Sequence, residues 1–429
     1  MMSDRTTSEA ASAVVAPERR RFLAKPSIQI TTFSSLRHRD YALLWSGILF
    51  TSSGMWMEQV ALNWLVYDMT GSALALGLLN GLRAIPSLVT GLFGGVAADR
   101  MDRKRLMLST QWMLLVLYAA LGTLIVTKHI AVWHLMAFTF VTGVVWTFNQ
   151  PVRQAILPSL VPREDLLNAV ALQSSAFNVT RVLGPAIGGF LIAWIGAGGA
   201  IFAEAAAWVA VLFLTAAMRV PPAPPRQHQA SVLRDLGEGV SYILRTQDIR
   251  ALIALAFLPF VVIMPYMTML TIFARDIFQM DAAGLGLMMS ISGIGALAAT
   301  LGVASLGNFR GKGKILMVTS LAMPVTLIAF AASRSMPISY TMLILVSAAS
   351  MAHLALTNTL INLIVPNQFR GRVMSVYMLD RGLQPLGSLL AGGIAAVWGA
   401  QWSLGFMGAL GLVLALGAIA VFPNVRRIE

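Results

Sequence analysis

The chain has 429 residues, of which 57% are hydrophobic and only 11% are charged, and its mean hydropathy is +0.74. Because soluble domains carry about 25% charged residues, this composition excludes an ordinary soluble protein. The formal net charge is +13, there is no cysteine and the five histidines are scattered, so neither a disulfide framework nor a metal site is expected.

The chain begins with a polar segment. Residues 1–40 are rich in Ala, Ser, Thr and Arg and contain no apolar run of the kind found in a cleaved signal peptide. We predict that this segment is a disordered cytoplasmic tail.

Twelve apolar runs follow, each close to the ~20 residues that a helix needs to cross a bilayer. Their residues do not alternate between apolar and polar, so they predict helices and not the strands of a barrel. The runs are 41–66, 74–97, 106–127, 131–149, 166–194, 200–218, 250–274, 284–307, 315–332, 338–363, 373–398 and 401–422. The predicted fold class is an all-α polytopic membrane protein with twelve transmembrane helices.

A polar stretch divides the runs into two groups of six. It opens with the stiff segment Pro221-Pro222-Ala223-Pro224-Pro225, after which apolar residues recur at helical spacing among charged ones. These apolar residues are Leu233, Leu236, Val240, Ile243 and Leu244. We predict one bundle at 41–218 and another at 250–422, joined by a cytoplasmic linker at 219–249 that contains an amphipathic helix on the membrane face. A short cytoplasmic tail at 423–429 closes the chain.

The second group of runs is a diluted copy of the first. Two glycine-containing triplets of the first group recur in the second. Gly184 and Gly387 are separated along the chain by the same number of residues as the first of these triplets and its copy. The triplets are Ile195-Gly196-Ala197 with Trp398-Gly399-Ala400, and Leu76-Gly77-Leu78 with Leu285-Gly286-Leu287. Such a duplication is common in secondary transporters, whose substrate site lies between the repeats near the bilayer midplane.

Basic residues are distributed unevenly between the two sets of loops. With the N-terminus placed in the cytoplasm, the inner segments hold 25 of the 31 Lys and Arg, and the outer loops hold only Lys128, Arg275 and Arg334. Because cytoplasmic loops are enriched in Lys and Arg, both termini are predicted to be cytoplasmic. The positive charge then faces anionic lipid headgroups, and no nucleic-acid partner is needed to explain it.

The segment between the second and third runs is unusually charged. It reads Gly94-Gly95-Val96-Ala97-Ala98-Asp99-Arg100-Met101-Asp102-Arg103-Lys104-Arg105. This pattern resembles the signature loop of the major facilitator superfamily, which implies two six-helix bundles related by a pseudo-twofold axis. The resemblance also implies that Asp99 meets the inner end of the eleventh helix and latches the halves in the outward-open state. The corresponding latch residues are Gly95, Asp99, Arg100, Arg103 and Arg105.

Further motifs resemble one branch of that superfamily, the drug exporters that include the enterobactin exporter and the macrolide efflux pumps. They lie at 63–72, 149–154, 160–165 and 181–189. The last contains the helix-packing motif Gly184, Pro185, Gly188 and Gly189, which the resemblance associates with antiport. The glycines by themselves predict close helix contact, and the proline predicts a bend.

Ionisable residues inside the runs are candidates for function, because each is costly in a bilayer unless it is paired or hydrated. At 1.5 Å per residue, Glu58 and Arg83 both lie ~25 Å from the inner ends of their helices, so they can pair. Asp380 lies at a depth similar to that of His353, and it can also pair with its neighbour Arg381. The candidate proton and charge network is Glu58, Arg83, Arg181, His353, Asp380 and Arg381. A structural role and a proton-carrying role both stay open for these groups, and Glu204 is expected at the outer interface.

The substrate cavity is expected between the first, fourth, seventh and tenth helices. Candidate lining residues are Trp56, Asn63, Trp146, Asn149, Phe260, Asn358 and Asn362. The 24 methionines and many aromatic residues suit a large, apolar to amphipathic substrate, although the same residue types also face lipid.

The sequence predicts a monomeric secondary transporter of the bacterial inner membrane. It is expected to export a lipophilic drug, siderophore or related small metabolite, by proton antiport with alternating access. The chain has no ATP-binding Gly-Lys-Ser/Thr loop and no nucleophile–base constellation, so we expect an ion gradient as the energy source, no cofactor and no enzyme activity. The alternatives are an uptake permease or facilitator on the same fold, and a non-transporting membrane sensor or assembly subunit.

Overall fold

The computed structural model describes residues 32–83, 85–86, 101–221, 232–307 and 309–423, and for 232–236 and 379–381 it describes the backbone only. Outside the described residues lie most of the predicted N-terminal tail, the latch residues Gly95, Asp99 and Arg100, most of the proline-rich break and the last six residues. The described part contains helices and no strands, as the composition predicted.

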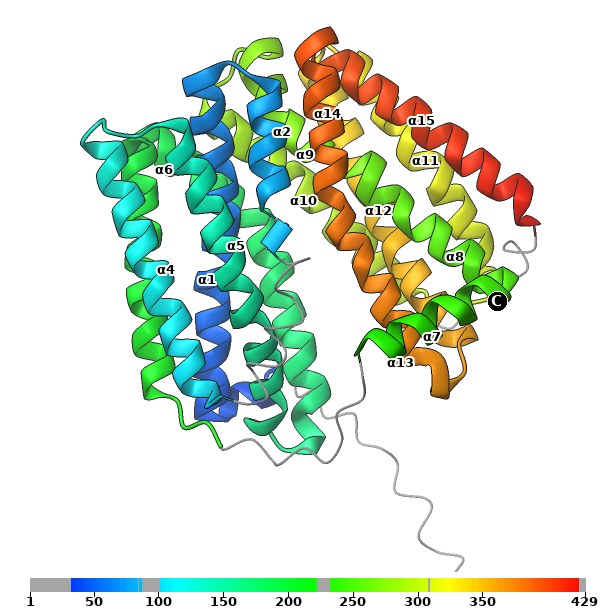
Figure 1. The fold of residues 1–429 in the computed structure, drawn as a ribbon, viewed down its shortest axis with the longest axis horizontal. Helices are drawn as coiled ribbons and strands as arrows, with labels where there is room; N and C mark the ends of the chain where they lie inside the picture. Colours follow the sequence, from blue (N-terminus) through cyan, green and yellow to red (C-terminus); the bar gives the residue numbers. More distant parts are fainter. Residues whose placement is uncertain (1–31, 84, 87–100, 222–231, 308, 424–429) are drawn as a thin grey trace, which may run out of the picture.

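Two helical bundles stand side by side (Figure 1). The first contains α1 (Arg39–Thr70), α2 (Ala73–Leu82), α4 (Arg103–Val126), α5 (Val132–Ile156) and α6 (Leu166–Ala217). The second contains α8 (Gln247–Leu258), α9 (Tyr266–Ile272), α10 (Ala282–Ser305), α11 (Lys312–Ala332), α12 (Met336–Ile364), α13 (Asn367–Tyr377), α14 (Gln384–Trp398) and α15 (Ala400–Val421). Eight helices in the described ranges are long and apolar enough to cross a membrane. We call the end where α1 stops and α15 starts, at the top of Figure 1, the upper end.

One glycine in each bundle turns the chain between two spans. Helix α6 covers the fifth and sixth predicted runs, and Gly196 interrupts it with φ 75° and ψ 169°. Gly399 separates α14 from α15 with φ 84° and ψ 161°. Only glycine adopts this backbone region readily, so the same turn is made by the same residue type in both halves. This agreement supports the internal duplication that the sequence predicted.

Two predicted runs are not single regular helices. The seventh run contains α8, the π-helical turn η4 (Pro259–Ile263), α9 and the π-helical turn η5 (Phe273–Ile277). The eleventh contains α13, the 3₁₀ turn η6 (Met378–Leu383) and α14. Proline has no amide hydrogen to donate, so Pro259 and Pro265 loosen the helical ladder of the seventh run.

Paired glycines join the two bundles. Gly189 of α6 faces Gly286 of α10, and a Cβ atom added to Gly189 would lie 3.0 Å from the Cα of Gly286. Gly77 of α2 and Gly392 of α14 meet in the same way, with a Cβ on Gly77 3.1 Å from the Cα of Gly392. These four residues lie toward the upper ends of their helices, so the bundles are in close contact there.

The linker helix α7 (Val232–Arg245) packs against α13. The rings of Tyr242 and Phe369 stack with their centroids 4.3 Å apart, and Glu238 forms an ion pair of 2.8 Å with Arg372. Of the apolar residues that the sequence placed on one face of this helix, Ile243 is buried, whereas Val240 and Leu244 are exposed in the protein.

Candidate functional site

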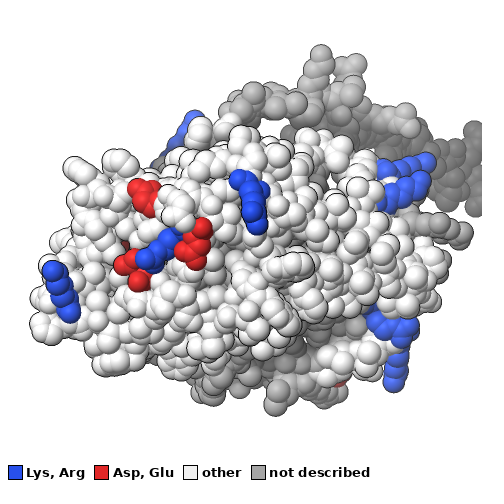
Figure 2. Space-filling model, turned by 90° about the horizontal axis from the view of Figure 1, so that it is seen from above, with Lys and Arg blue, Asp and Glu red and all other residues white. Residues whose placement is uncertain are grey.

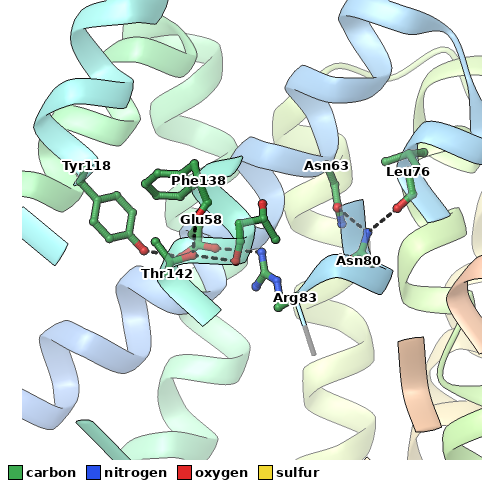
Figure 3. Close-up of polar contacts among 9 residues, drawn as sticks. Glu58, Asn63, Leu76, Asn80, Arg83, Tyr118, Phe138 and Thr142 are labelled. Atoms are coloured by element: carbon green, nitrogen blue, oxygen red, sulfur yellow. Dashed lines mark hydrogen bonds and ion pairs between the residues drawn. The ribbon is translucent and has the colours of Figure 1, made fainter. Parts of the chain in front are cut away.

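The most prominent polar group in the first bundle surrounds Glu58 of α1. Its side chain is only 3% exposed. Arg83 contributes its Nη2, 2.8 Å from Oε1 of Glu58, and the hydroxyl of Tyr118 on α4 donates a hydrogen bond to Oε2. Figure 3 shows Tyr118 and Arg83 approaching the carboxylate from opposite sides. The Glu58–Arg83 pair, which helix depth predicted, is therefore present.

A second carboxylate lies beside this pair. Glu204 of α6 is 2% exposed and lies close enough to Glu58 and Tyr118 to interact with both. Its Oε2 has no hydrogen-bond partner among the described residues. Glu204 lies in the helix that follows the turn at Gly196, but it is not exposed as an interfacial side chain would be: that helix directs it into the bundle, over Gly54.

Aromatic rings pack around Tyr118 beside the two buried carboxylates. The ring of Tyr118 packs edge-on against Phe138 at 5.1 Å and stacks with Trp208 at 6.3 Å. In such surroundings an unbalanced charge is costly. The group formed by Glu58, Arg83, Tyr118 and Glu204, which we call the carboxylate cluster, contains two acids and one guanidinium.

Several predicted cavity residues are instead engaged inside the first bundle. Asn63 is fully buried and accepts a hydrogen bond of 2.9 Å from Asn80 (Figure 3). Asn149 is also fully buried, and it donates to Thr110 at 2.8 Å. Trp146 packs against Trp208 of α6 with a centroid distance of 5.9 Å. Asn63 and Asn149 therefore do not line an open cavity in this conformation, because both are buried within their own bundle, whereas Trp146 is partly exposed.

Arg153 of α5 was not among the sequence candidates, yet it is a buried cation. Its Nη1 donates to Thr51 at 3.0 Å and its Nη2 to Asn149 at 3.2 Å, and its guanidinium lies 5.7 Å from the ring of Trp146. Neutral acceptors therefore satisfy both terminal nitrogens.

Arg181 and Trp56 lie at the seam between the bundles. The guanidinium of Arg181 lies 5.9 Å from the ring of Trp56 on α1, and its Nη1 is 4.0 Å from the sulfur of Met351 on α12. The backbone of Arg181 is close to Gly293 of α10. No described carboxylate forms an ion pair with Arg181, so the structure separates it from the charge network in which the sequence placed it.

The polar residues predicted in the second bundle form separate contacts. His353 is fully buried, its Nε2 contacts the carbonyl oxygen of Leu255 at 3.0 Å, and its Nδ1 contacts Ser320 at 3.2 Å. Both ring nitrogens therefore contact partners other than Asp380. These contacts support a structural role for His353 in the packing of the second bundle. The side chains of Asp380 and Arg381 lie outside the described atoms.

The remaining cavity candidates lie on two elements of the second bundle, α12 and η4. Asn362 donates to Oδ1 of Asn358 at 2.7 Å, one turn earlier on α12, and both side chains are partly exposed. Phe260 is partly exposed within η4.

The packing motif of α6 works in two directions. A Cβ on Gly184 would lie 2.8 Å from the Cβ of Trp56, and one on Gly188 would lie 2.8 Å from the Cα of Met57. The lack of a side chain at Gly184 and Gly188 therefore lets α1 approach α6 closely, and the lack of one at Gly189 lets α10 of the other bundle approach. Pro185 lies between them in a continuous stretch of helix.

The described end of the signature loop contacts its own bundle. Arg103 donates to the carbonyl of Ala155 at 3.1 Å, near the end of α5, and Arg105 is exposed. Lys104 donates to the carbonyls of Ala216 and Met218, both at 2.7 Å, where α6 ends. Cations at helix C-termini are favoured by the free carbonyls and the helix dipole. In this conformation these residues cap helices, and no contact between them and the second bundle is described.

A clamp joins the bundles at the upper end. The hydroxyl of Tyr67 on α1 donates to Asp276 of η5, and Arg275 forms an ion pair of 3.0 Å with Asp68. The Arg275 guanidinium also lies 5.7 Å from the Tyr67 ring. Figure 2 shows that most of this face is uncharged, that acidic and basic side chains lie together in one small group, and that several basic side chains lie apart from it.

The sequence missed Tyr118, Glu204 and this clamp. Tyr118 lies in an apolar run and resembles any core aromatic residue. For Glu204 a signal existed, because an unpaired acid in an apolar run is costly wherever it lies. Among the described residues no group of three His, Asp or Glu side chains could hold a metal ion.

Comparison with known proteins finds similarity to membrane transport and secretion proteins. Residues 30–429 match the family model described as transmembrane secretion effector. The chain is 27% identical to the staphyloferrin A transporter of Staphylococcus aureus over 83% of this chain and 89% of that protein. It is 25% identical to the multidrug efflux pump Tap of Mycolicibacterium fortuitum over 89% and 95% of the two chains. A solved bacterial homologue of the human lysosomal transporter Spinster shares the fold, with a TM-score of 0.70 and 16% identity over 91% of this chain and 98% of that one.

Proposed function

Because the chain belongs to the transmembrane secretion effector family of the major facilitator superfamily, we propose that it exports a lipophilic drug, siderophore or related small metabolite by proton antiport. The family makes it a multi-pass membrane transporter and not an enzyme. Its relatives named as a multidrug efflux pump and a staphyloferrin A transporter support small molecules of these classes.

The orientation that we propose follows from the basic residues. Inner segments of the predicted topology hold 25 of the 31 Lys and Arg, so the lower end faces the cytoplasm and its anionic lipid headgroups. The upper end, with the Tyr67–Asp276 clamp and the Gly189–Gly286 contact, then faces outward and is closed. This conformation corresponds to the inward-facing state of an alternating-access cycle.

The single observation that carries proton coupling is the carboxylate cluster. Glu58 and Glu204 are both buried and share one guanidinium, that of the partly exposed Arg83. Charge balance there is met when one proton is held by the two acids. Loss of that proton leaves a net negative charge, which is disfavoured in a dry environment and can bias the bundle toward a conformation that readmits a proton.

Tyr118 gives the proton a position between the acids. Its hydroxyl donates to Glu58 while its ring is fixed between Phe138 and Trp208. The Glu58 side chain and its guanidinium partner lie on α1 and just after α2, so a change in their pairing acts directly on two helices that also contact the other bundle.

Proteoliposomes that contain a pH dye test this proposal. Under an imposed proton gradient, a panel of hydrophobic cations, macrolides and catecholate siderophores should include a compound that dissipates the gradient. That response should disappear in Glu58→Gln. A substrate-dependent response that is unchanged in both Glu58→Gln and Glu204→Gln contradicts the proposed proton site. Substrate flux without any proton movement contradicts antiport.

A further inference from the structure

Arg181 is a buried cation that pairs with no carboxylate among the described residues. The residue is 8% exposed, and its Nε has no hydrogen-bond partner among the described residues. The contacts that the guanidinium does make are with the Met351 sulfur at 4.0 Å and the Trp56 ring at 5.9 Å. Arginine does not lose its proton in proteins, so this site retains a full positive charge.

The contrast with Arg83, which is partly exposed, and Arg153, which is buried, is informative. Arg83 pairs with Glu58 at 2.8 Å, and Arg153 donates to Thr51 and Asn149. Only Arg181, of these three, lacks both an acid and a neutral oxygen acceptor. A charge that is buried without such partners destabilises the protein, so its presence calls for a partner that the chain does not supply.

Trp56 adds a second unsatisfied donor to the same place. Its residue is 8% exposed and its Nε1 has no hydrogen-bond partner among the described residues. The Arg181 guanidinium lies over the Trp56 ring, and the ring of Phe177 lies next to it, with its centroid 6.0 Å from that of Trp56. Two donors without partners, Arg181 Nε and Trp56 Nε1, and the rings of Trp56 and Phe177 therefore belong to one group of neighbouring side chains.

This group lies between the bundles. Trp56 belongs to α1 and Arg181 to α6 of the first bundle, while Met351 belongs to α12 of the second. The backbone of Arg181 also touches Gly293 of α10. A ligand held here contacts elements that must separate and rejoin during alternating access.

Helical geometry separates this place from the carboxylate cluster. Trp56 and Glu58 are two residues apart on α1, so their side chains point in directions about 200° apart. Trp56 faces Arg181 on α6, whereas Glu58 faces Tyr118 and Arg83. The two charge systems therefore occupy opposite faces of one helix.

We propose that Arg181 and Trp56 form the anion-recognising part of the substrate site, and that the substrate carries a carboxylate on an aromatic or otherwise apolar body. Arg181 binds the carboxylate through its planar array of N–H donors, Trp56 adds its indole N–H, and the rings of Trp56 and Phe177 pack against the apolar body. This inference rests on the proposed function, because it takes the bound anion to be the transported molecule.

Three probes of one shape test the charge preference: 2-naphthylacetate, 2-naphthylacetamide and 2-naphthylethylammonium. Binding is measured by calorimetry on the full chain in nanodiscs, with chloride replaced by gluconate. A charge-assisted hydrogen bond predicts that the carboxylate binds at least about tenfold more tightly than the amide, and that the ammonium binds least.

Variants at Arg181 connect the preference to this residue. Arg181→Met should remove the difference between carboxylate and amide, and Arg181→Lys should keep part of it, because an ammonium retains charge but not the planar donor array. Arg334→Met, at an exposed loop position, is the matched control and should leave all three affinities unchanged.

Thermal unfolding without ligand shows whether the variant folds and separates recognition from structure. Arg181→Met removes an uncompensated buried charge, so its unfolding temperature should equal or exceed that of the parent chain. Addition of 2-naphthylacetate should raise the unfolding temperature of the parent and not that of Arg181→Met. A variant that unfolds at markedly lower temperature while it keeps the carboxylate preference makes Arg181 a structural residue and overturns the proposal.

The other outcomes are equally decisive. Equal binding of the three probes, or an Arg181-dependent stabilisation by chloride without any binding of 2-naphthylacetate, overturns the proposal, and the second result identifies an inorganic counter-ion. Proton-coupled export of neutral or cationic compounds with no carboxylate preference rejects this inference and leaves the proposed function standing. Arg181-dependent carboxylate binding without proton-coupled transport supports the inference and rejects antiport.

Discussion

Gly189 of α6 and Gly286 of α10 lie so close together that a Cβ on Gly189 would be 3.0 Å from the Cα of Gly286. The same relation holds between Gly77 and Gly392 on the other side of the pseudo-twofold axis. Small residues let helix backbones approach in a membrane, where there is no hydrophobic force to drive association. The closed upper end therefore depends on the absence of side chains at these four positions.

Replacement of Gly286 by valine should disfavour this closed state. The added side chain meets the carbonyl of Pro185 and the Cα of Gly189, and such overpacking costs about 1–3 kcal/mol. Since 1.4 kcal/mol is a factor of ten, we expect the outward-open population to rise about tenfold or more. Spin labels on cysteines at Leu74 and Trp402 report the upper-end distance, and the natural chain has no cysteine to remove.

Gly302→Val on the same helix is the matched control, because nothing lies within 4 Å of a Cβ at that position. Its distance distribution should match that of the parent chain. If Gly286→Val leaves the upper-end distance unchanged as well, the glycine contact does not hold the upper end closed.

The two acids of the carboxylate cluster should differ in their effect on stability. Glu58→Gln leaves the Arg83 guanidinium without the carboxylate that it contacts at 2.8 Å, and loss of one partner from a buried pair costs about 3 kcal/mol, which is an upper bound here because Arg83 is 30% exposed. Glu204→Gln removes a carboxylate whose Oε2 has no donor, so it should cost less or stabilise. Thermal unfolding of the two variants in one detergent compares them, and a larger loss in Glu204→Gln contradicts this assignment of Arg83 to Glu58.

Tyr118→Phe separates proton positioning from packing. The phenyl ring keeps the contacts with Phe138 and Trp208 and removes only the hydroxyl that donates to Glu58. We expect proton-coupled flux to fall and its dependence on pH to move, with little change in substrate affinity. Flux and pH profile identical to those of the parent remove Tyr118 from the coupling mechanism.

The upper clamp should depend more on Tyr67 than on Asp68. Tyr67 is mostly buried, and its hydroxyl donates a hydrogen bond to the carboxylate of Asp276. Such a hydrogen bond to a charged group contributes about 1.5 kcal/mol, so Tyr67→Phe should increase the population with an open upper end about tenfold. The Asp68–Arg275 pair is exposed, and such pairs contribute about 0.5 kcal/mol. Asp68→Asn should therefore change the label distances at Leu74 and Trp402 much less. The opposite ranking contradicts the proposed clamp.

Asp99 is predicted to act in the opposite state. By its resemblance to the superfamily loop it latches the lower end when the transporter is outward-open, so Asp99→Asn should increase the inward-facing population. Labels at Leu167 and Leu306 report the lower end. Asp102→Ala is the control: Asp102 caps α4 through a 2.7 Å bond to the Arg105 amide, and its loss should cost about 1 kcal/mol of stability without a shift in this distance.

The resemblance and the apolar runs predicted most of the fold. Membrane-spanning segments must satisfy their own backbone groups, so a run of about 20 apolar residues has few alternatives to a helix. The glycines that make the turns at Gly196 and Gly399 were visible as a repeat for the same reason, since their backbone conformation admits almost no other residue. Helix depth alone placed Glu58 beside Arg83.

Depth does not give the direction in which a side chain points, and this limited the prediction of the site. Asn63 and Asn149 lie in the expected helices but face polar partners within their own bundle. Glu204 lies near the expected level, yet the rotation of its helix buries it beside Glu58.

What the sequence by itself determined is the set of helices, their repeat and the residues that a bilayer makes costly. Which of those residues meet was decided only by the tertiary structure, because the rotation of each helix about its axis is set by packing against all its neighbours at once. Glycines such as Gly184 and Gly189 fix that rotation by admitting one particular partner surface. The pairing of Glu58 with Arg83, and the lack of an acidic partner for Arg181 within the described part of the chain, both follow from it.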